Sequence, residues 1–134
     1  MSDIRDGLIN DDIKCSCRGF NLDKLLQPRI LTLLMQGDLH GYVMIQSLEK
    51  QDPFGFDKVD NAGVYRTLKK MESQKLIYSK WIHQESGAAK KIYRISAKGR
   101  ESLCTWIHTL EQYQQGIERI LIKAKTYISG CEEN

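Results

Sequence analysis

The sequence predicts a mainly α-helical protein with one small β-hairpin, which places it in the α+β class. Within residues 61–100, a helix with a narrow apolar stripe precedes two β-rich runs joined by a glycine-containing tip. Upstream, a tight link containing two glycines separates two short helical segments. Downstream, apolar residues recur every three or four positions over residues 103–128. This order is that of a winged helix-turn-helix with a long C-terminal dimerisation helix.

Composition sets broad limits on the 134 residues. The chain is 41% hydrophobic and 28% charged, as in an ordinary soluble protein, and no apolar run reaches the roughly 18 residues of a membrane span. The acidic start, MSDIRDGLINDD, is not a signal peptide, so we expect a cytoplasmic protein without membrane contact. We divide the chain into a flexible N-terminal segment (1–21), a winged helix-turn-helix DNA-binding domain (22–96) and a dimerisation helix (97–130).

Two short helices should form the first half of the domain. Pro28 suits a first helical turn, where its missing N–H costs nothing. Residues 29–36 are apolar nearly all round, which predicts a central helix, and Gly37 should end it. A second helix is expected over residues 41–50, with Tyr42, Ile45 and Leu48 buried.

The third helix, expected over residues 61–75, carries chemistry on its free face. Val64, Leu68 and Met71 form its buried stripe, and Asp60 or Asn61 should cap its first free N–H groups. A thin stripe with a basic, aromatic-bearing free face suits the major groove of DNA. The residues of that free face are Ala62, Tyr65, Arg66, Lys69 and Ser73, with Lys70 beside them.

A basic hairpin should follow, with strands over residues 76–83 and 91–96. Residues 58–100 hold 11 Lys/Arg and 3 Asp/Glu, a net charge of +8, whereas the whole chain is +3. The remainder therefore sums to 3 − 8 = −5, and the basic charge is concentrated on one helix and its hairpin. Such a patch is an electrostatic footprint for phosphate, although a solvated lysine-rich face would look the same.

We assign DNA-binding roles within this unit. Arg66 has the geometry to read guanine with two hydrogen bonds, whereas the lysines should position the protein on phosphate. Tyr65 should meet DNA, the alternative being a tyrosine that packs on the hairpin. Tyr93 and Ile95 should be core, which leaves Arg94 on the other strand face, free to reach the DNA backbone. The expected DNA-binding residues are Asn61, Tyr65, Arg66, Lys69, Lys70, Lys90, Lys91 and Arg94.

The last helix should begin after a Ser96 cap and run over residues 97–128. An apolar stripe of this length cannot be buried against a domain of roughly 80 residues, so we expect a homodimer. Trp106 on this stripe could stack a planar effector or simply pack in the core. The expected interface residues are Leu103, Ile107, Leu110, Tyr113, Ile117, Ile120, Leu121 and Ile128.

Cys15-x-Cys17 is the feature that this scheme leaves unexplained. Two thiolates at this spacing can chelate a soft metal ion or form a redox pair, with Cys131 or Cys104 as a further ligand. The alternative is unconnected cytosolic thiols. The three histidines, His40, His83 and His108, have no acid at ligand or triad spacing, and no P-loop or GxGxxG occurs. We therefore expect no enzyme and no required cofactor.

Three segments in register resemble the PadR family of transcriptional regulators. They are LQPRILTLLMQGDLHGYVMIQSLEK (26–50), NAGVYRTLKKMESQKLI (61–77) and KKIYRISAKGRESL (90–103). The resemblance implies a dimeric winged helix-turn-helix protein of the small type with a single C-terminal helix, usually a repressor. It also implies that Tyr65 meets double-stranded DNA, that a wing near residues 87–91 reaches the backbone or minor groove, and that a small aromatic or apolar effector releases DNA.

One departure from the family concerns the wing. Where the family often has Pro-Arg-Arg-Lys, this chain reads Ala-Ala-Lys-Lys, so its wing is less basic. We predict a sequence-specific DNA-binding transcriptional regulator, a repressor released by a small-molecule effector, that acts as a homodimer on a two-fold operator. An uncharged groove face would instead favour a winged-helix protein-interaction module without specific DNA binding. A metal- or redox-sensing regulator using Cys15 and Cys17 is the other alternative.

Overall fold

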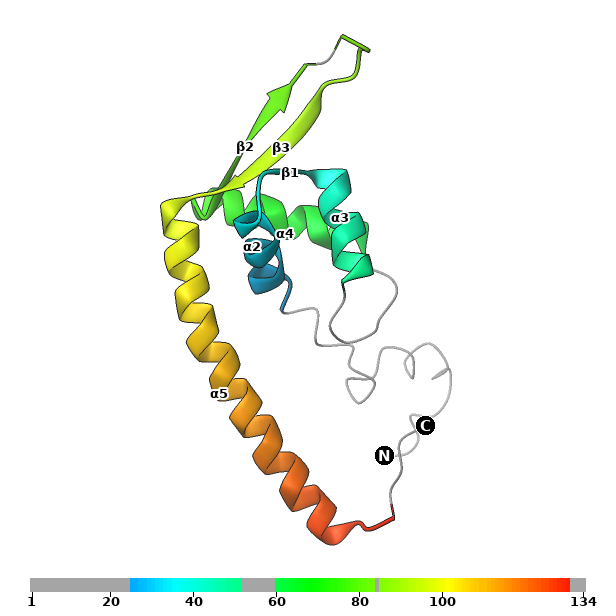
Figure 1. The fold of residues 1–134 in the computed structure, drawn as a ribbon, viewed down its shortest axis with the longest axis vertical. Coiled ribbons are helices and arrows are strands. Elements are labelled where there is room, and N and C mark those ends of the chain that lie inside the picture. The colour runs from blue at the N-terminus through cyan, green and yellow to red at the C-terminus, as the bar shows by residue number, and fades with distance from the viewer. Residues whose placement is uncertain (1–24, 52–59, 84, 131–134) are drawn as a thin grey trace, which may run out of the picture.

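The computed structural model describes residues 25–51, 60–83 and 85–130. Figure 1 shows short helices gathered beneath a projecting β-hairpin, with a long helix leading away from them. The elements in chain order are α2 (Leu26–Met35), β1 (Leu39–His40), α3 (Gly41–Lys50), α4 (Asn61–Ser73), β2 (Ile77–Ile82), β3 (Lys90–Ile95) and α5 (Ala97–Tyr127). The architecture confirms the predicted fold class.

Helix α2 is central to the core. Ile30 and Leu31 are completely buried, and Leu33 and Leu34 nearly so, because the helix packs on α3, α4, β3 and α5. Pro28 lies in its first turn and is also buried. Gly37 follows the helix with φ of 152°, a conformation that a side chain would strain, so the predicted helix stop is confirmed.

Helix α3 buries the predicted face except at one residue. Gly41, Met44, Ile45 and Leu48 face the core. Tyr42, which we expected to be buried, is 68% exposed, and its hydroxyl accepts a hydrogen bond from the Gln46 side chain (3.1 Å). The prediction was wrong because the apolar periodicity did not distinguish Tyr42 from Gly41, and the small glycine is the residue that faces inward.

Helix α4 buries the predicted stripe of Val64, Leu68 and Met71. Asp60 occupies the N-cap position, but its side chain accepts no capping hydrogen bond, so the expected cap chemistry is wrong. After the helix, Lys75 takes the left-handed conformation with φ of 66°, and the Leu76 N–H donates to the Met71 carbonyl at 3.0 Å. This turn directs the chain into the hairpin.

The sheet has three antiparallel strands in the order β1-β3-β2. In the hairpin, Tyr78 lies opposite Arg94 and Trp81 lies opposite Lys91. The predicted hairpin is present, but the sequence did not predict β1, whose two residues are too short to show an alternating pattern. Strand β1 pairs with β3 and joins the hairpin to the start of α3.

Helix α5 begins at a close backbone contact. The Ser96 hydroxyl accepts from the Gly99 N–H at 2.9 Å, which confirms the predicted cap, and it lies 2.7 Å from the Lys75 carbonyl, to which it donates. A Cβ on Gly99 would overlap the Leu76 carbonyl oxygen and lie 2.8 Å from Ile95 Cγ1. Glycine is therefore needed for the helix to start this close to the hairpin.

The rest of α5 leaves the body. Leu103 and Trp106 are partly buried against the core of their own chain. For Trp106 this is the core packing that the sequence left open beside the effector role, and for Leu103, an expected interface residue, it is a contact within the chain. Beyond them the same apolar stripe continues without cover, since Tyr113, Ile117 and Ile120 are between 53% and 71% exposed. Figure 1 shows this part of the helix extending past α2, α3 and α4. Among the residues that the structure describes, no helix is long and apolar enough to cross a membrane.

Candidate nucleic-acid interface

The solvent side of α4 is exposed along its length. Tyr65 is 45% exposed, and the polar and basic residues predicted to face DNA from this helix also lie in solvent. The buried stripe on the opposite side fixes the helix on the core, so its free face is presented rigidly. The exposed residues of this face, which we call the α4 face, are Asn61, Tyr65, Arg66, Lys69 and Lys70.

Tyr65 has a packed ring as well as an exposed surface. A Cβ on Gly41 would lie 3.2 Å from Tyr65 Cε1 and 3.4 Å from Tyr93 Cε1, so the glycine makes room for both rings at the start of α3. Tyr65 therefore bridges α4, α3 and the hairpin. Its packing was the alternative that the sequence left open, and the exposed remainder of the ring is still available to a ligand.

Arg66 is held only loosely. Its guanidinium lies 3.7 Å from the Asp60 carboxylate, and the two side chains are 74% and 67% exposed. An ion pair this long and this exposed contributes little to stability, because solvent screens it. Arg66 can therefore exchange Asp60 for another acceptor at small cost.

Lys91, one of the residues expected to contact phosphate, is engaged within the fold. Its Nζ lies 3.5 Å from Glu72 Oε1, and it also lies over the rings of Trp81 and Tyr93, 5.8 and 5.6 Å from their centroids. The second Glu72 oxygen accepts from the Ser79 hydroxyl. These contacts tie α4 to the hairpin, while the neighbouring Lys90 is exposed.

Arg94 is also not free, contrary to the sequence-based expectation. Its Nε and Nη2 both contact the Asp38 carboxylate, with the shortest distance 2.8 Å from Nη2 to Oδ2. This hydrogen bonding lowers the pKa of Asp38 and raises that of Arg94. The pair links the turn after α2 to β3, so Arg94 has a structural partner on the surface where we expected a DNA contact.

Asp38 and Glu72 are the residues that sequence reasoning missed. Each neutralises a cation of the hairpin, but Asp38 and Arg94 are 56 positions apart, and no local pattern connects them. The count of 11 Lys/Arg in residues 58–100 therefore overstates how many cations are available to phosphate, because Lys91 and Arg94 are already paired.

A hollow of about 530 Å³ lies between the start of α3, Tyr65 of the α4 face and the hairpin. We call it the wing-base pocket. Tyr65 from α4, Tyr42 from α3 and Trp81 from β2 contribute its exposed aromatic rings. The remaining lining residues are His40, Gly41, Val43, Lys90, Lys91 and Tyr93.

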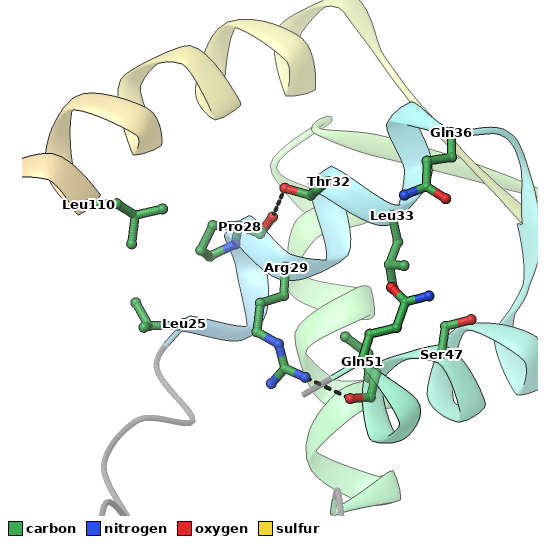
Figure 2. Close-up of a pocket in the computed structure, with 10 residues that line it drawn as sticks. Leu25, Pro28, Arg29, Thr32, Leu33, Gln36, Ser47, Gln51 and Leu110 are labelled. Atoms are coloured by element: carbon green, nitrogen blue, oxygen red, sulfur yellow. Dashed lines mark hydrogen bonds between the residues drawn. The ribbon is translucent and has the colours of Figure 1, made fainter. Parts of the chain in front are cut away.

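A second, smaller cavity of about 280 Å³ lies on the other side of the helices. Figure 2 shows Leu25, Pro28 and Leu110 at one end, and Ser47 of α3 and its C-cap residue Gln51 at the other. Arg29 crosses it and donates to the Leu48 carbonyl at 2.7 Å. Trp106, our candidate for the effector site, is not among the residues that line this cavity.

The proposed metal site lies almost entirely outside the described residues. Cys15, Cys17 and Cys131 are outside the described ranges, and Cys104 is an exposed thiol on α5. Within the described ranges, no group of three or more His, Cys, Asp or Glu side chains is arranged to hold a metal ion. The metal or redox role of these cysteines therefore stays a prediction from the sequence.

The comparisons with known proteins agree with this geometry. The family model described as the transcriptional regulator PadR-like family matches residues 30–105. No curated protein matches the chain. A PadR-like transcriptional regulator from Bacillus cereus is 27% identical, with a TM-score of 0.63 over 75% of this chain and 94% of that one.

Two further structures are similar. PadR from Bacillus subtilis, in complex with operator DNA, is 25% identical, with a TM-score of 0.56 over 62% of this chain and 46% of that one. A PadR family regulator from Eggerthella lenta is 22% identical, with a TM-score of 0.66 over 86% and 97% of the two chains, and shows the shared fold. Because the family model covers more than half of the chain, this protein belongs to the PadR-like family of transcriptional regulators.

Proposed function

We propose that the protein binds a specific two-fold operator as a homodimer, with the α4 face in the major groove. The observation that carries this proposal is that α4 exposes Tyr65, Arg66 and Lys69 opposite its fully buried stripe. A rigid helix with a basic free face fits the width of the major groove. The Bacillus subtilis relative, whose structure is in complex with operator DNA, supports the operator-binding part of this proposal.

The contacts divide by chemistry. Arg66, whose ion pair with Asp60 is long and exposed, is the candidate for reading a guanine edge. Lys69, Lys70 and Lys90 are exposed and suit phosphate, which fixes register but carries no sequence information. Lys91 and Arg94 are omitted from this set because Glu72 and Asp38 already hold them.

The dimer in this proposal forms through α5. The stripe that packs on the body at Leu103 continues beyond it as exposed apolar residues, among them Ile117 and Leu121. A second copy of the same helix would cover it, and two-fold symmetry would then set two α4 faces about one helical turn of DNA apart, roughly 34 Å. In this proposal the chain consists of a DNA-binding domain over residues 22–96 and a dimerisation helix over residues 97–130.

The repressor and effector roles are part of the same proposal. The 280 Å³ cavity between α2, the end of α3 and Leu110 of α5 is where a small apolar molecule would contact both the DNA-binding domain and the dimerisation helix. Its size is near the lower end for small-molecule sites. A ligand there could change the angle of α5 and hence the spacing of the two α4 faces.

Selection of bound sequences from random duplex DNA tests the central claim. The purified protein should enrich a two-fold palindrome, and Arg66→Ala should relax the preference at one base pair per half-site by about 1–3 kcal/mol. A matched control is Arg100→Ala, which removes an exposed arginine from the first turn of α5. Failure to enrich any palindrome would favour a winged-helix protein-interaction module.

A further inference from the structure

Asp60 occupies the N-cap position of α4, but its carboxylate contacts an arginine rather than the helix end. The side chain accepts no capping hydrogen bond. Instead its Oδ2 lies 3.7 Å from Arg66 Nη2. Six positions separate the two residues, so Arg66 lies between one and two turns further along the helix. The ion pair therefore spans the N-terminal part of the α4 face.

Gly63 lies between these two side chains and leaves room for their contact. A Cβ on Gly63 would lie 2.8 Å from Asp60 Oδ2 and 3.5 Å from Arg66 Nη2. The backbone does not require a glycine at this position, because Gly63 is not among the described residues with positive φ. Glycine is also a poorer helix former than alanine. The space above Gly63 is thus what allows the carboxylate to approach Arg66.

The stability of the helix does not account for this arrangement. An aspartate at an N-cap normally accepts a hydrogen bond from a free N–H of the first turn, and Asp60 lacks that bond. Its pair with Arg66 contributes little in the free protein, since solvent screens two charges that are this exposed. When DNA covers the α4 face and displaces water, the same pair becomes stronger because the local dielectric constant falls.

A carboxylate at the start of α4 acts differently on phosphates and on bases. The free N–H groups of a helix start attract any phosphate, whatever the DNA sequence, and the Asp60 charge opposes this. A guanine edge presents the neutral acceptors O6 and N7 to a guanidinium. Arg66 carries five N–H donors, so it can donate to guanine and to Asp60 at the same time.

We propose that Asp60 is a positioning residue that increases the selectivity of the protein for its operator. Its carboxylate holds the Arg66 guanidinium toward guanine and disfavours a contact of Arg66 with phosphate. The inference rests on the proposed function, in which Arg66 reads a base edge in the major groove. From the sequence, Asp60 was expected only as a helix cap.

Asp60→Asn tests the role of the charge. Asparagine has nearly the same shape and is equally suited to an N-cap, so α4 should stay intact. The measured quantity is the selectivity ratio, the Kd for scrambled duplex divided by the Kd for the selected operator, obtained by fluorescence anisotropy. It should fall by about tenfold, chiefly because scrambled DNA binds more tightly. Glu101→Gln is the matched control, since it removes an exposed carboxylate from α5 and should leave the ratio unchanged.

A double-mutant cycle tests whether Asp60 acts through Arg66. In the Arg66→Ala background, Asp60→Asn should change the selectivity ratio by no more than about twofold, because the group that it positions is absent. A full tenfold fall in that background would show that Asp60 acts on phosphate alone and would overturn the positioning role.

Gly63→Ala tests the geometry without changing any charge. The added methyl group would lie 2.8 Å from Asp60 Oδ2, and that flexible side chain can turn away from Arg66. The selectivity ratio should therefore fall at least about threefold, while the urea midpoint of unfolding stays the same or rises. Gly116→Ala is the control, because a Cβ there meets nothing and the residue lies on α5.

The outcomes separate this inference from the proposed function. If the protein selects an operator and Arg66→Ala relaxes its base preference, the proposed function stands. An unchanged selectivity ratio in Asp60→Asn or in Gly63→Ala would then refute only the role of Asp60, as would an equal fall in the Glu101→Gln control. If no operator is selected from random DNA, the proposed function itself fails.

Discussion

Asp38 holds Arg94 through a two-point ion pair that joins the turn after α2 to the last strand of the hairpin. Both Nε and Nη2 of the guanidinium contact the carboxylate, the closest approach being 2.8 Å. Paired contacts of this kind fix orientation better than a single one, even though both groups are on the surface. The pair therefore restrains the hairpin relative to the turn after α2.

This pair predicts a specific pH dependence of stability. Hydrogen bonding to Arg94 holds the pKa of Asp38 below its ordinary value of 3.8. A carboxylate whose folded pKa is lowered stabilises the fold above its unfolded pKa, and this contribution is lost as pH falls through the folded value. The stability difference between the parent and Asp38→Asn should thus be constant above about pH 5 and shrink below it. Urea unfolding at several pH values measures this, and a difference that grows on acidification would contradict the assignment.

Lys90 and its neighbour Lys91 should contribute differently to the salt dependence of DNA binding. If the dimer uses Lys69, Lys70 and Lys90 of each subunit, about six phosphate contacts give a slope near −5 for log affinity against log salt. Lys90→Ala should flatten that slope by about 2, one charge per subunit, whereas Lys91→Ala should leave it nearly unchanged because Glu72 holds Lys91. Anisotropy titrations of operator and scrambled duplex at several salt concentrations distinguish the two. Equal effects would show that Lys91 leaves Glu72 in the complex.

Freeing Lys91 from Glu72 should strengthen DNA binding. Glu72→Gln keeps an acceptor for the Ser79 hydroxyl but removes the charge that holds Lys91. Affinity for both operator and scrambled DNA should rise, with a slope steeper by up to about 2. The double variant Glu72→Gln/Lys91→Ala is the control and should lose the gain. An affinity increase that survives in the double variant would not come from Lys91.

Two glycines of α5 should respond to alanine in opposite directions. Gly99→Ala sets a methyl group against the Leu76 carbonyl oxygen and should lower the free energy of unfolding by about 1–3 kcal/mol or more. Gly116 has open space around its Cβ position, so Gly116→Ala should raise the free energy of unfolding by about 0.5–1 kcal/mol. Thermal and urea unfolding report both changes. Destabilisation by Gly116→Ala would reveal a close helix crossing at that point.

The proposed dimer interface is tested on one face of α5. Ile117→Lys with Leu121→Lys puts two charges on the exposed stripe and should yield a folded monomer, because neither residue contacts the body. Ile122→Lys is the control, since Ile122 is 59% exposed but lies off the stripe. Sedimentation velocity at micromolar concentration measures the oligomeric state of each variant. A dimer that withstands the double substitution would exclude this stripe as the interface.

The sequence by itself determined the order and faces of the main elements. Val64, Leu68 and Met71 repeat with the helical period, so α4 and its exposed face were readable without a structure, as were the Ser96 cap and the long stripe of α5. These signals are local, because each depends on residues within a few positions of one another. The family resemblance rested on the same local segments and was confirmed.

Only the tertiary structure decided which charges are free and which aromatic residues are exposed. Asp38 pairs with Arg94, and Glu72 with Lys91, across distances in sequence that no periodicity records. Tyr42 points to solvent because Gly41 takes the inward position beside Tyr65. The pairing of β1 with β3 then brings His40, Trp81 and Tyr65 around one hollow. Periodicity tells which side of an element is buried, whereas the partner of each exposed side chain depends on how the elements pack.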